Sequence, residues 1–388
     1  MIEILQRVGF FPRACVWELT LACNLRCKHC GSIAGNKRAD ELSLDECMRV
    51  AGELVELGCR RVTLSGGEPT MYPGWHEVGR RLVELGARVN LISNGLTWSA
   101  KHIDQAQKAG LCGAAFSIDG FEKEHDEFRA PGSFVKVVRA IDLSVAAGLP
   151  VAVNTTINRL NQGQLKSLRQ FLMDHRVFAW QLQFATATGN MGEHKEMVSP
   201  PEDLLWLVPQ IAELCRINCP EFKVYPSDDI GYFGNPEPDL RDADSALPFW
   251  LGCRAGCQVI GIESGGNVKG CLSLPSSMLG EARFIEGNVR QKSLRDIWNR
   301  ADAFAYNRLF KEDQLGGFCR VCRYRDVCRG GCSWATYAQG GGGNENCFYC
   351  QVVKHRRFEL LAEEPTDEEI RYFPGHSPNA ASAAGGKP

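Results

Sequence analysis

The sequence lacks the features that would indicate a membrane or nucleic-acid partner. No apolar run approaches the ~18 residues that a membrane-spanning helix needs, and the N-terminus lacks the pattern of an export signal. Neither sign of charge dominates, because 44 Lys and Arg oppose 46 Asp and Glu for a net charge of −2. This balance argues against binding to a nucleic-acid backbone or an anionic membrane, and we expect a cytoplasmic globular protein.

Cysteine is plentiful but not dense enough for a disulfide scaffold. The chain has 18 cysteines among 388 residues, whereas short disulfide-linked proteins exceed ~8–10%. In a large chain without an export signal thiols stay reduced, so clustered cysteines indicate metal ligation. The cysteines outside the clusters are expected to be small buried hydrophobic residues, namely Cys15, Cys47, Cys59, Cys112, Cys215 and Cys219.

The first two-thirds of the chain alternate predicted strands and helices. The strands are expected at Ala14–Leu21, Arg61–Leu64, Arg88–Ser93, Gly113–Ile118, Val151–Ile157 and Val177–Phe184. A capping box of Ser43 and Glu46 predicts the start of the first intervening helix, and Gly58 its end. Repeated strand–helix units give parallel strands. About six units fall short of a closed eight-stranded barrel, so we predict an α/β fold with an open, partial (β/α)6 barrel.

The composition changes after residue 200. A helix is expected around Glu202–Cys215, a Pro/Asp/Gly-rich stretch follows, and Gln258–Ile262 and Asn267–Leu272 form a predicted hairpin. We predict a lead at 1–13, the barrel at 14–225, a linker at 226–252, a small cysteine-rich, loop-dominated domain at 253–360, and a tail at 361–388 with a disordered end.

Three cysteines stand within eight residues directly after the first predicted strand, in Cys23-Asn-Leu-Arg-Cys27-Lys-His29-Cys30. A structural zinc site would need a fourth ligand, and the adjacent His29 and Cys30 would bind one ion only with strain. A 4Fe–4S cluster held by three cysteines instead leaves one iron open for an outside ligand. The motif therefore favours such a cluster over zinc or bystander thiols.

The C-x3-C-x2-C spacing, with the aromatic His29 before the last cysteine, resembles that of the radical S-adenosylmethionine enzymes. In that family S-adenosylmethionine chelates the open iron through its amino and carboxylate groups. The segment Ser65-Gly66-Gly67-Glu68-Pro69 matches the family's GGE motif, in which glycines allow close backbone approach to the ligand and Glu68 would accept from the ammonium group. Without the cysteines, this segment would be interpreted as a turn with an exposed Glu.

Other strand ends carry further candidate contacts to the cofactor. The resemblance implies that Ser117 and Arg129 hold its carboxylate, for which the planar donor fork of arginine is suited. Asn154 is a candidate for the ribose hydroxyls, and Asn94 and His29 complete the predicted cofactor-binding set. Each of these strand-end residues has an alternative interpretation as an ordinary turn or cap residue.

The C-terminal region contains Cys319-x2-Cys322-x5-Cys328-x3-Cys332, with further cysteines upstream at 253, 257 and 271 and downstream at 347 and 350. This pattern resembles the SPASM extension of the same family, which binds one or two auxiliary 4Fe–4S clusters. The resemblance assigns one cluster to Cys253, Cys257, Cys271 and Cys332, and the other to Cys319, Cys322, Cys328 and Cys347. Cys350 competes with Cys347 for the last position, and a pair of zinc sites is the alternative to the clusters. The predicted cofactors are thus three 4Fe–4S clusters and S-adenosylmethionine.

The resemblance implies an oxidoreductase that cleaves S-adenosylmethionine to a 5′-deoxyadenosyl radical and modifies a ribosomally made peptide. The expected partners are the precursor peptide and a flavodoxin- or ferredoxin-type reductant. Because little chain precedes the first strand, the leader is expected to be recognised either by a separate protein or by the barrel itself. Sulfatase maturation is disfavoured, because such relatives place an acidic residue where Leu272 follows Cys271. The alternatives are a radical enzyme for a small molecule and a non-catalytic iron–sulfur or zinc scaffold. The sequence identifies no catalytic base.

Overall fold

The computed structural model describes residues 2–217, 219–227, 229–231, 236–241, 250–276 and 283–339. The chain divides into two compact units. The barrel unit comprises Met1–Ser199, Ile217–Ser227 and Arg254–Leu309, and the second unit comprises Pro200–Arg216, Asp228–Cys253 and Phe310–Pro388. In this division Arg254–Leu309, which the sequence analysis placed in the C-terminal domain, groups with the barrel unit.

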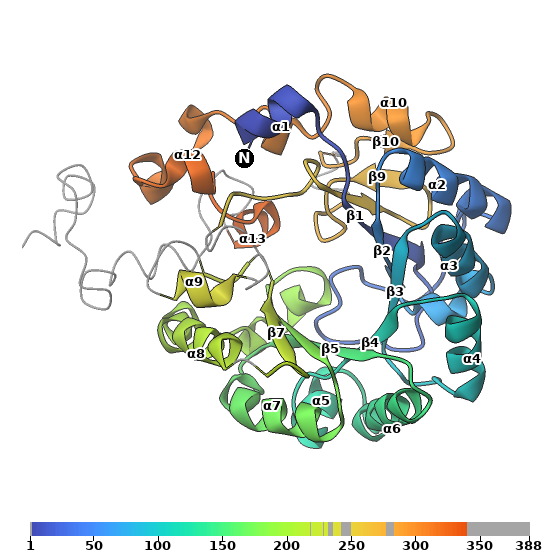
Figure 1. The fold of residues 1–388 in the computed structure, drawn as a ribbon. Coiled ribbons are helices and arrows are strands. Elements are labelled where there is room, and N and C mark those ends of the chain that lie inside the picture. The colour runs from blue at the N-terminus through green and yellow to red at the C-terminus, as the bar shows by residue number, and fades with distance from the viewer. Residues whose placement is uncertain are drawn as a thin grey trace, which may run out of the picture. The chain divides into compact units, whose positions relative to one another are not determined.

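The barrel unit is built around one ten-stranded sheet with the order β10-β9-β8-β1-β2-β3-β4-β5-β6-β7. Its strands are β1 (Ala14–Thr20), β2 (Arg61–Gly66), β3 (Arg88–Ser93), β4 (Gly113–Ser117), β5 (Val151–Ile157), β6 (Ala179–Phe184), β7 (Lys223–Pro226), β8 (Val259–Ile262), β9 (Asn267–Lys269) and β10 (Gly287–Asn288). All neighbours from β1 to β7 pair in parallel, which confirms the predicted open α/β barrel and its six strands. Figure 1 shows α2, α3, α4, α6 and α7 on the outer side of the curved sheet.

Two strands join the parallel sheet that the sequence analysis did not place there. The short β7 pairs with β6 at the start of the predicted linker. The other strand, β8, pairs in parallel with β1, and β9 then turns back antiparallel to β8, which confirms the predicted hairpin. The sheet therefore continues on both sides of the six predicted strands.

The helices of the barrel unit are α1 (Ile2–Val8), α2 (Leu44–Glu56), α3 (Trp75–Glu84), α4 (Ala100–Lys108), α5 (Glu122–Phe128), α6 (Ser133–Ala146), α7 (Leu165–Asp174), α10 (Leu294–Asn299) and α11 (Ala305–Arg308). The predicted capping box is confirmed at the start of α2, where the Ser43 side chain accepts from the Glu46 amide and the Glu46 side chain accepts from the Ser43 amide. Gly58 follows this helix with a φ of +101°, a conformation that favours glycine.

Alternate residues along β5 show which face of the sheet the helices cover. Val151, Val153 and Thr155 are buried, whereas Ala152 and Asn154 on the opposite face are half-buried. Because side chains alternate between the faces of a strand, one set packs beneath the helices and the other lines the inner face of the curve. Parallel strands also present their carboxyl ends along one edge, where the loops that follow them meet.

The second unit contains α8 (Leu204–Arg216), α9 (Glu237–Leu240), α12 (Arg325–Cys328) and α13 (Ser333–Gln339). The helix α9 lies within the predicted linker, and its buried Glu237 accepts from Arg241 Nε at 2.6 Å and from the Trp250 amide at 2.8 Å. The described part of this stretch is therefore folded back on itself by a buried ion pair, which the Pro/Asp/Gly composition did not indicate.

The cysteines predicted to be buried behave in two ways. Cys15, Cys47 and Cys59 are buried as expected, but Cys112 is exposed, and Cys215 and Cys219 are partly buried. The prediction for Cys112 is wrong because this residue precedes β4 at the amino end of the strand, where its thiol donates to Val89 O at 3.0 Å. None of the described cysteines forms a disulfide. In the described part of the chain, no helix combines the length and apolar character needed to span a bilayer.

The capping box makes a testable contribution to stability. Ser43→Ala removes the acceptor for the Glu46 amide and is expected to lower the free energy of unfolding by about 1 kcal/mol. Ser99→Ala is the matched control, because Ser99 is the N-cap of α4 but its side chain accepts no cap hydrogen bond there. Urea unfolding of the two variants measures the difference, and equal losses would contradict the assigned role of Ser43.

Candidate functional site

The three-cysteine loop begins at the carboxyl end of β1 and is folded tightly. Backbone amides donate to two of its sulfurs, from Leu25 to Cys23 Sγ at 3.4 Å and from Ala34 to Cys30 Sγ at 3.3 Å. Burial raises the pKa of the Cys27 thiol to about 11; the charge of Arg129 opposes this rise, and the Cys23 and Cys30 thiols add to it. The three thiols thus lie close enough for their charges to interact.

The donor set fits a 4Fe–4S cluster better than a single ion. Among the described residues, no three His, Cys, Asp or Glu side chains converge closely enough to hold one metal ion. The imidazole of His29 stacks on the Phe128 ring, with centroids 4.2 Å apart, and its Nε2 lies 3.9 Å from Asp119 Oδ2. His29 is therefore engaged elsewhere, whereas a 4Fe–4S cluster binds each thiolate through a different iron and needs no such convergence.

The two glycines of the GGE motif let β2 contact the backbone next to the cysteine loop. A Cβ on Gly66 would lie 2.3 Å from Thr20 O, and one on Gly67 would lie 2.4 Å from Ala22 O. The amides of Gly67 and Glu68 donate to Thr20 O and Ala22 O, each at 2.8 Å. Close backbone contact within the protein therefore requires these glycines, in addition to any approach to a ligand.

Glu68 is buried rather than exposed and joins the ends of two strands. It is 1% exposed, its Oε1 accepts from Thr70 Oγ1 at 2.6 Å and from Ser93 Oγ at 3.0 Å, and its Oε2 accepts from the Asn94 amide at 2.8 Å. Burial raises the pKa of Glu68, and these hydrogen bonds oppose the rise. The carboxylate thus positions the turn of Asn94, and its contact with a cofactor ammonium group stays a prediction.

Asn94 in turn reaches the cysteine loop. Its Nδ2 donates to Asn24 Oδ1 at 2.7 Å and lies 3.8 Å from Cys23 Sγ. From the end of β6, the Asn190 side chain donates to Cys27 O at 3.0 Å and the Asn190 amide to Cys30 O at 3.1 Å. The cysteine loop is therefore held from the carboxyl ends of β2, β3 and β6.

Arg129 at the end of α5 forms a buried ion pair beside the same loop. Its Nε donates to Asp119 Oδ2 at 2.5 Å, and its Nη1 lies 3.9 Å from Cys27 Sγ. Asp119 is fully buried; burial works against its ionisation, but the Arg129 charge holds the pKa of this carboxyl below its usual value. Arg129 thus supplies positive charge to a cysteine, and its predicted contact with a cofactor carboxylate stays a prediction.

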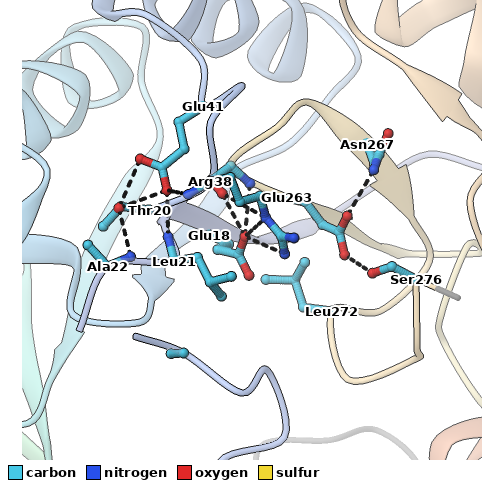
Figure 2. A network of polar contacts seen from close by, with 12 residues as sticks. Glu18, Thr20, Leu21, Ala22, Arg38, Glu41, Glu263, Asn267, Leu272 and Ser276 are labelled. Atoms are coloured by element: carbon cyan, nitrogen blue, oxygen red, sulfur yellow. Dashed lines mark hydrogen bonds and ion pairs between the residues drawn. The ribbon is translucent and has the colours of Figure 1, made fainter. Parts of the chain in front are cut away.

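A second acidic network supports the other side of the loop, as Figure 2 shows. Glu41 Oε1 accepts from Thr20 Oγ1 at 2.9 Å and from the Leu21 amide at 2.8 Å, so it fixes the end of β1. Glu18, also buried on β1, accepts through Oε1 from Arg38 Nε at 3.2 Å and from Ser264 Oγ at 2.8 Å. This network connects β1 to the loop that follows β8.

Three polar side chains form a row across the inner face of the sheet. Ser117 on β4 lies opposite Asn154 on β5, and Asn154 lies opposite Gln181 on β6. Ser117 and Asn154 are half-buried and Gln181 is exposed, and within the described residues none of the three side chains makes a hydrogen bond. This polar row (Ser117, Asn154 and Gln181) is available to bind a polar ligand.

The predicted auxiliary ligands divide between the compact units. In the barrel unit, Cys257 is fully buried before β8, and Cys271 follows β9. The buried Lys269 holds the loop after Cys271, since its Nζ contacts Glu263 Oε1 at 2.9 Å and donates to Leu272 O at 3.2 Å.

In the second unit, the thiols of Cys253 and Cys332 hydrogen bond to one another, and this bond, with burial, raises the pKa of Cys332 well above its usual value. The described ligands of the other predicted cluster, Cys319, Cys322 and Cys328, also lie in this unit and are buried. Cys347 and its competitor Cys350 lie outside the described residues.

Several residues of the site were not assigned by the sequence analysis. They are buried or half-buried polar side chains whose partners are distant in sequence, namely Glu18, Arg38, Glu41, Asp119 and Asn190. A charged residue inside the apolar strand Ala14–Thr20 was a usable signal for Glu18. Asn190 carried no such signal, because its segment has no regular periodicity.

Comparisons with known proteins find similarity along most of the chain. A family described as the radical SAM superfamily matches residues 17–172, and SPASM, described as an iron–sulfur cluster-binding domain, matches residues 253–323. The AdoMet-dependent heme synthase of Methanosarcina barkeri is 29% identical over 348 residues, which cover 87% of this chain and 96% of that protein. The mycofactocin maturase MftC of Mycobacterium ulcerans is 29% identical over 332 residues, covering 85% of each.

A solved structure supports the fold. The crystal structure of Streptococcus suis SuiB bound to S-adenosylmethionine has a TM-score of 0.67 at 17% identity, covering 86% of this chain and 76% of that one. At this identity the likeness concerns the fold alone.

The close contact of Gly67 with the cysteine loop can be tested by adding one methyl group. Gly67→Ala is expected to displace Ala22 and abolish assembly of the first cluster, so that reconstituted protein loses about four iron atoms per chain. Gly31→Ala is the matched control within the same loop, because a Cβ there meets nothing within 4 Å. Iron analysis after anaerobic reconstitution gives the answer, with circular dichroism to verify folding; full iron content in Gly67→Ala would contradict the assignment.

The Asp119–Arg129 pair predicts a strong energetic coupling. Arg129→Met leaves a buried carboxylate without its partner and is expected to lower the free energy of unfolding by about 3–5 kcal/mol. The double variant Asp119→Asn/Arg129→Met removes both charges and is expected to recover part of that loss. Urea unfolding of the single and double variants measures the coupling, and additive losses would show that the pair is not coupled.

Proposed function

The chain is a radical SAM protein with a C-terminal SPASM domain, and we propose that it modifies a ribosomally made peptide by oxidation at an unactivated carbon. When bound at Cys23, Cys27 and Cys30, a 4Fe–4S cluster supplies the electron that converts S-adenosylmethionine to a 5′-deoxyadenosyl radical. The residues of the chain bind and orient these groups and exclude water from the barrel interior.

The observation that carries the proposal is the way in which the three-cysteine loop is held. The backbone of Gly66 and Gly67 and the side chains of Asn94 and Asn190 all fix this loop at the carboxyl edge of the sheet. His29 is turned to Phe128 and Asp119, so a fourth coordination position is left to an outside ligand. Such an arrangement is suited to a reactive cluster and is not needed by an electron-carrying scaffold.

The polar row supports a peptide as the substrate. Ser117 and Asn154 are the proposed contacts for the carboxylate and ribose of the cofactor, which leaves the exposed amide of Gln181, opposite Asn154 on the neighbouring strand, for the substrate. An amide both donates and accepts hydrogen bonds, as a peptide backbone does, so a peptide is suited to this position. The related MftC is a maturase, and SuiB has been solved with its precursor peptide SuiA.

A second candidate function is a reaction on a small molecule. The alignment with the heme synthase spans 96% of that protein, at the same 29% identity as the alignment with MftC. This similarity favours a tetrapyrrole as the alternative substrate class. A tetrapyrrole has flat apolar faces, which suit aromatic side chains, and carboxylate side groups, which suit cations. The polar row contains neither an aromatic ring nor a cation, so it is less suited to this ligand than to a peptide.

Further parts of the proposal concern cofactors and partners. We propose two auxiliary 4Fe–4S clusters with the cysteine assignments given above, and a flavodoxin- or ferredoxin-type protein as electron donor. A separate leader-recognition protein would deliver the precursor peptide. We place the protein in the cytoplasm, because the described cysteines are all free thiols and iron–sulfur ligation needs them reduced.

The first test is cleavage of S-adenosylmethionine. Anaerobically reconstituted protein with dithionite is expected to form 5′-deoxyadenosine, and Cys27→Ala is expected to form none because it lacks a cluster ligand. Cys112→Ala removes an exposed thiol outside the site and is the matched control, with unchanged formation expected. Chromatography with mass detection measures the product. If wild-type protein forms no more 5′-deoxyadenosine than Cys27→Ala, the proposed enzymatic function is wrong.

The second test separates the substrate classes. If a short reading frame lies beside the gene, co-expression with the peptide it encodes is expected to change the peptide's mass by loss of hydrogen or of a larger group. Incubation with heme precursors is expected to leave them unchanged. The opposite pair of results would replace the peptide with a tetrapyrrole substrate.

A further inference from the structure

Arg308 is a buried cation, and one of its three guanidinium nitrogens has no hydrogen-bond partner in the described chain. It ends α11, is 5% exposed, and its guanidinium lies over the rings of Phe10, Trp298 and Phe304 at 4.6, 4.4 and 4.6 Å from their centroids. Nε donates to Gly256 O and Nη1 to Trp298 O, each at 2.6 Å. Nη2 is equally buried but has no hydrogen-bond partner in the described chain.

An unpartnered donor on a buried charge is costly. A buried polar group without a partner costs about 1–3 kcal/mol, and more when it is charged. The three aromatic rings stabilise the cation in part, but they do not accept the remaining Nη2 hydrogens as a sulfur or oxygen would. Burial lowers the pKa of Arg308 to about 10, so the guanidinium is still positive at neutral pH. The unpartnered Nη2 therefore indicates that an anion lies beside it when the protein holds its cofactors.

The negative groups around Arg308 identify that anion. The Cys257 thiol is 0% exposed and belongs to the residue that follows Gly256, whose carbonyl accepts from Arg308 Nε at 2.6 Å. Glu286 is also near, but its Oε2 is paired with Arg300 at 2.7 Å and its Oε1 accepts from the Phe304 amide at 2.8 Å. Cys257 is the predicted ligand of an auxiliary cluster, so the unsatisfied partner is the thiolate–cluster unit.

We propose that Arg308 sets the reduction potential of the auxiliary cluster bound by Cys257, by donating through Nη2 to a sulfur of that cluster. This inference rests on the proposed assignment of Cys257 as a ligand. Reduction adds one electron and hence one negative charge to the cluster, which a fixed cation beside it stabilises. Arg308 would therefore hold the potential higher and make the cluster a better acceptor of the electron that an oxidised substrate releases. Arg308 is a positioning and tuning residue, not a catalytic one.

The potential is measured on the full chain with Cys23, Cys27 and Cys30 all changed to Ala, so that only auxiliary clusters remain. In this background Arg308→Met is expected to shift one midpoint to a more negative value. At the original midpoint, the ratio of reduced to oxidised cluster would fall at least tenfold, which is 59 mV for one electron. Arg308→Lys keeps the positive charge but loses the planar set of guanidinium donors, so an intermediate shift of the midpoint is expected. Arg295→Met, an exposed charge on α10, is the matched control and is expected to shift nothing.

A spectroscopic arm does not depend on the folding of a variant. In the same three-alanine background, labelling with 15N-arginine is expected to give a 15N coupling to the reduced cluster in pulsed EPR spectra. Unchanged midpoints in Arg308→Met, or no 15N coupling, would overturn the role of Arg308. If Cys257 is not a cluster ligand, the result is different: Cys257→Ala then leaves the iron content and EPR spectra of the three-alanine background unchanged.

Discussion

The close approach of two strand ends is the constraint on which the rest of the site depends. Where β1 and β2 end side by side, the carbonyls of Thr20 and Ala22 accept from the amides of Gly67 and Glu68, and no side chain fits between them. This backbone contact fixes where the cysteine loop begins. Glu68, which follows these glycines, accepts from the backbone amide of Asn94 and so also fixes the residue after β3. The loop is thus held by main-chain geometry, which is less mobile than long side chains.

Buried arginines recur beside the cysteines of the barrel unit. Arg129 approaches Cys27 while paired with Asp119, and Arg308 lies by Cys257 while surrounded by rings. Thiolates that gather around an inorganic centre concentrate negative charge in a low-dielectric interior, where a nearby cation is worth more than at the surface. The two arginines differ in how their own burial is compensated, one by a carboxylate and the other by aromatic faces and backbone carbonyls.

Local patterns in the sequence predicted much of this architecture, and distant contacts account for what was missed. The six strands, the Ser43 cap and the hairpin of β8 and β9 follow from periodicity and turn residues within short windows. The spacing of Cys23, Cys27 and Cys30 likewise indicated the cluster loop. By contrast, Arg308 contacts Phe10 and Gly256, and Glu18 accepts from Ser264, although these residues are far apart in the sequence. No local window of the sequence contains these contacts. The interior position of Glu68 also depended on partners supplied by another strand.

The pairing of β8 with β1 has a consequence for how the chain can be divided. β1 is not an edge strand, because β2 covers one side and β8 covers the other. A fragment that stopped before residue 253 would leave unpaired those backbone N–H and C=O groups of Ala14–Trp17 that face β8. Such an open edge recruits other chains and promotes aggregation. The segment matched by SPASM therefore supplies strands β8, β9 and β10, which continue the sheet of the barrel beyond β1.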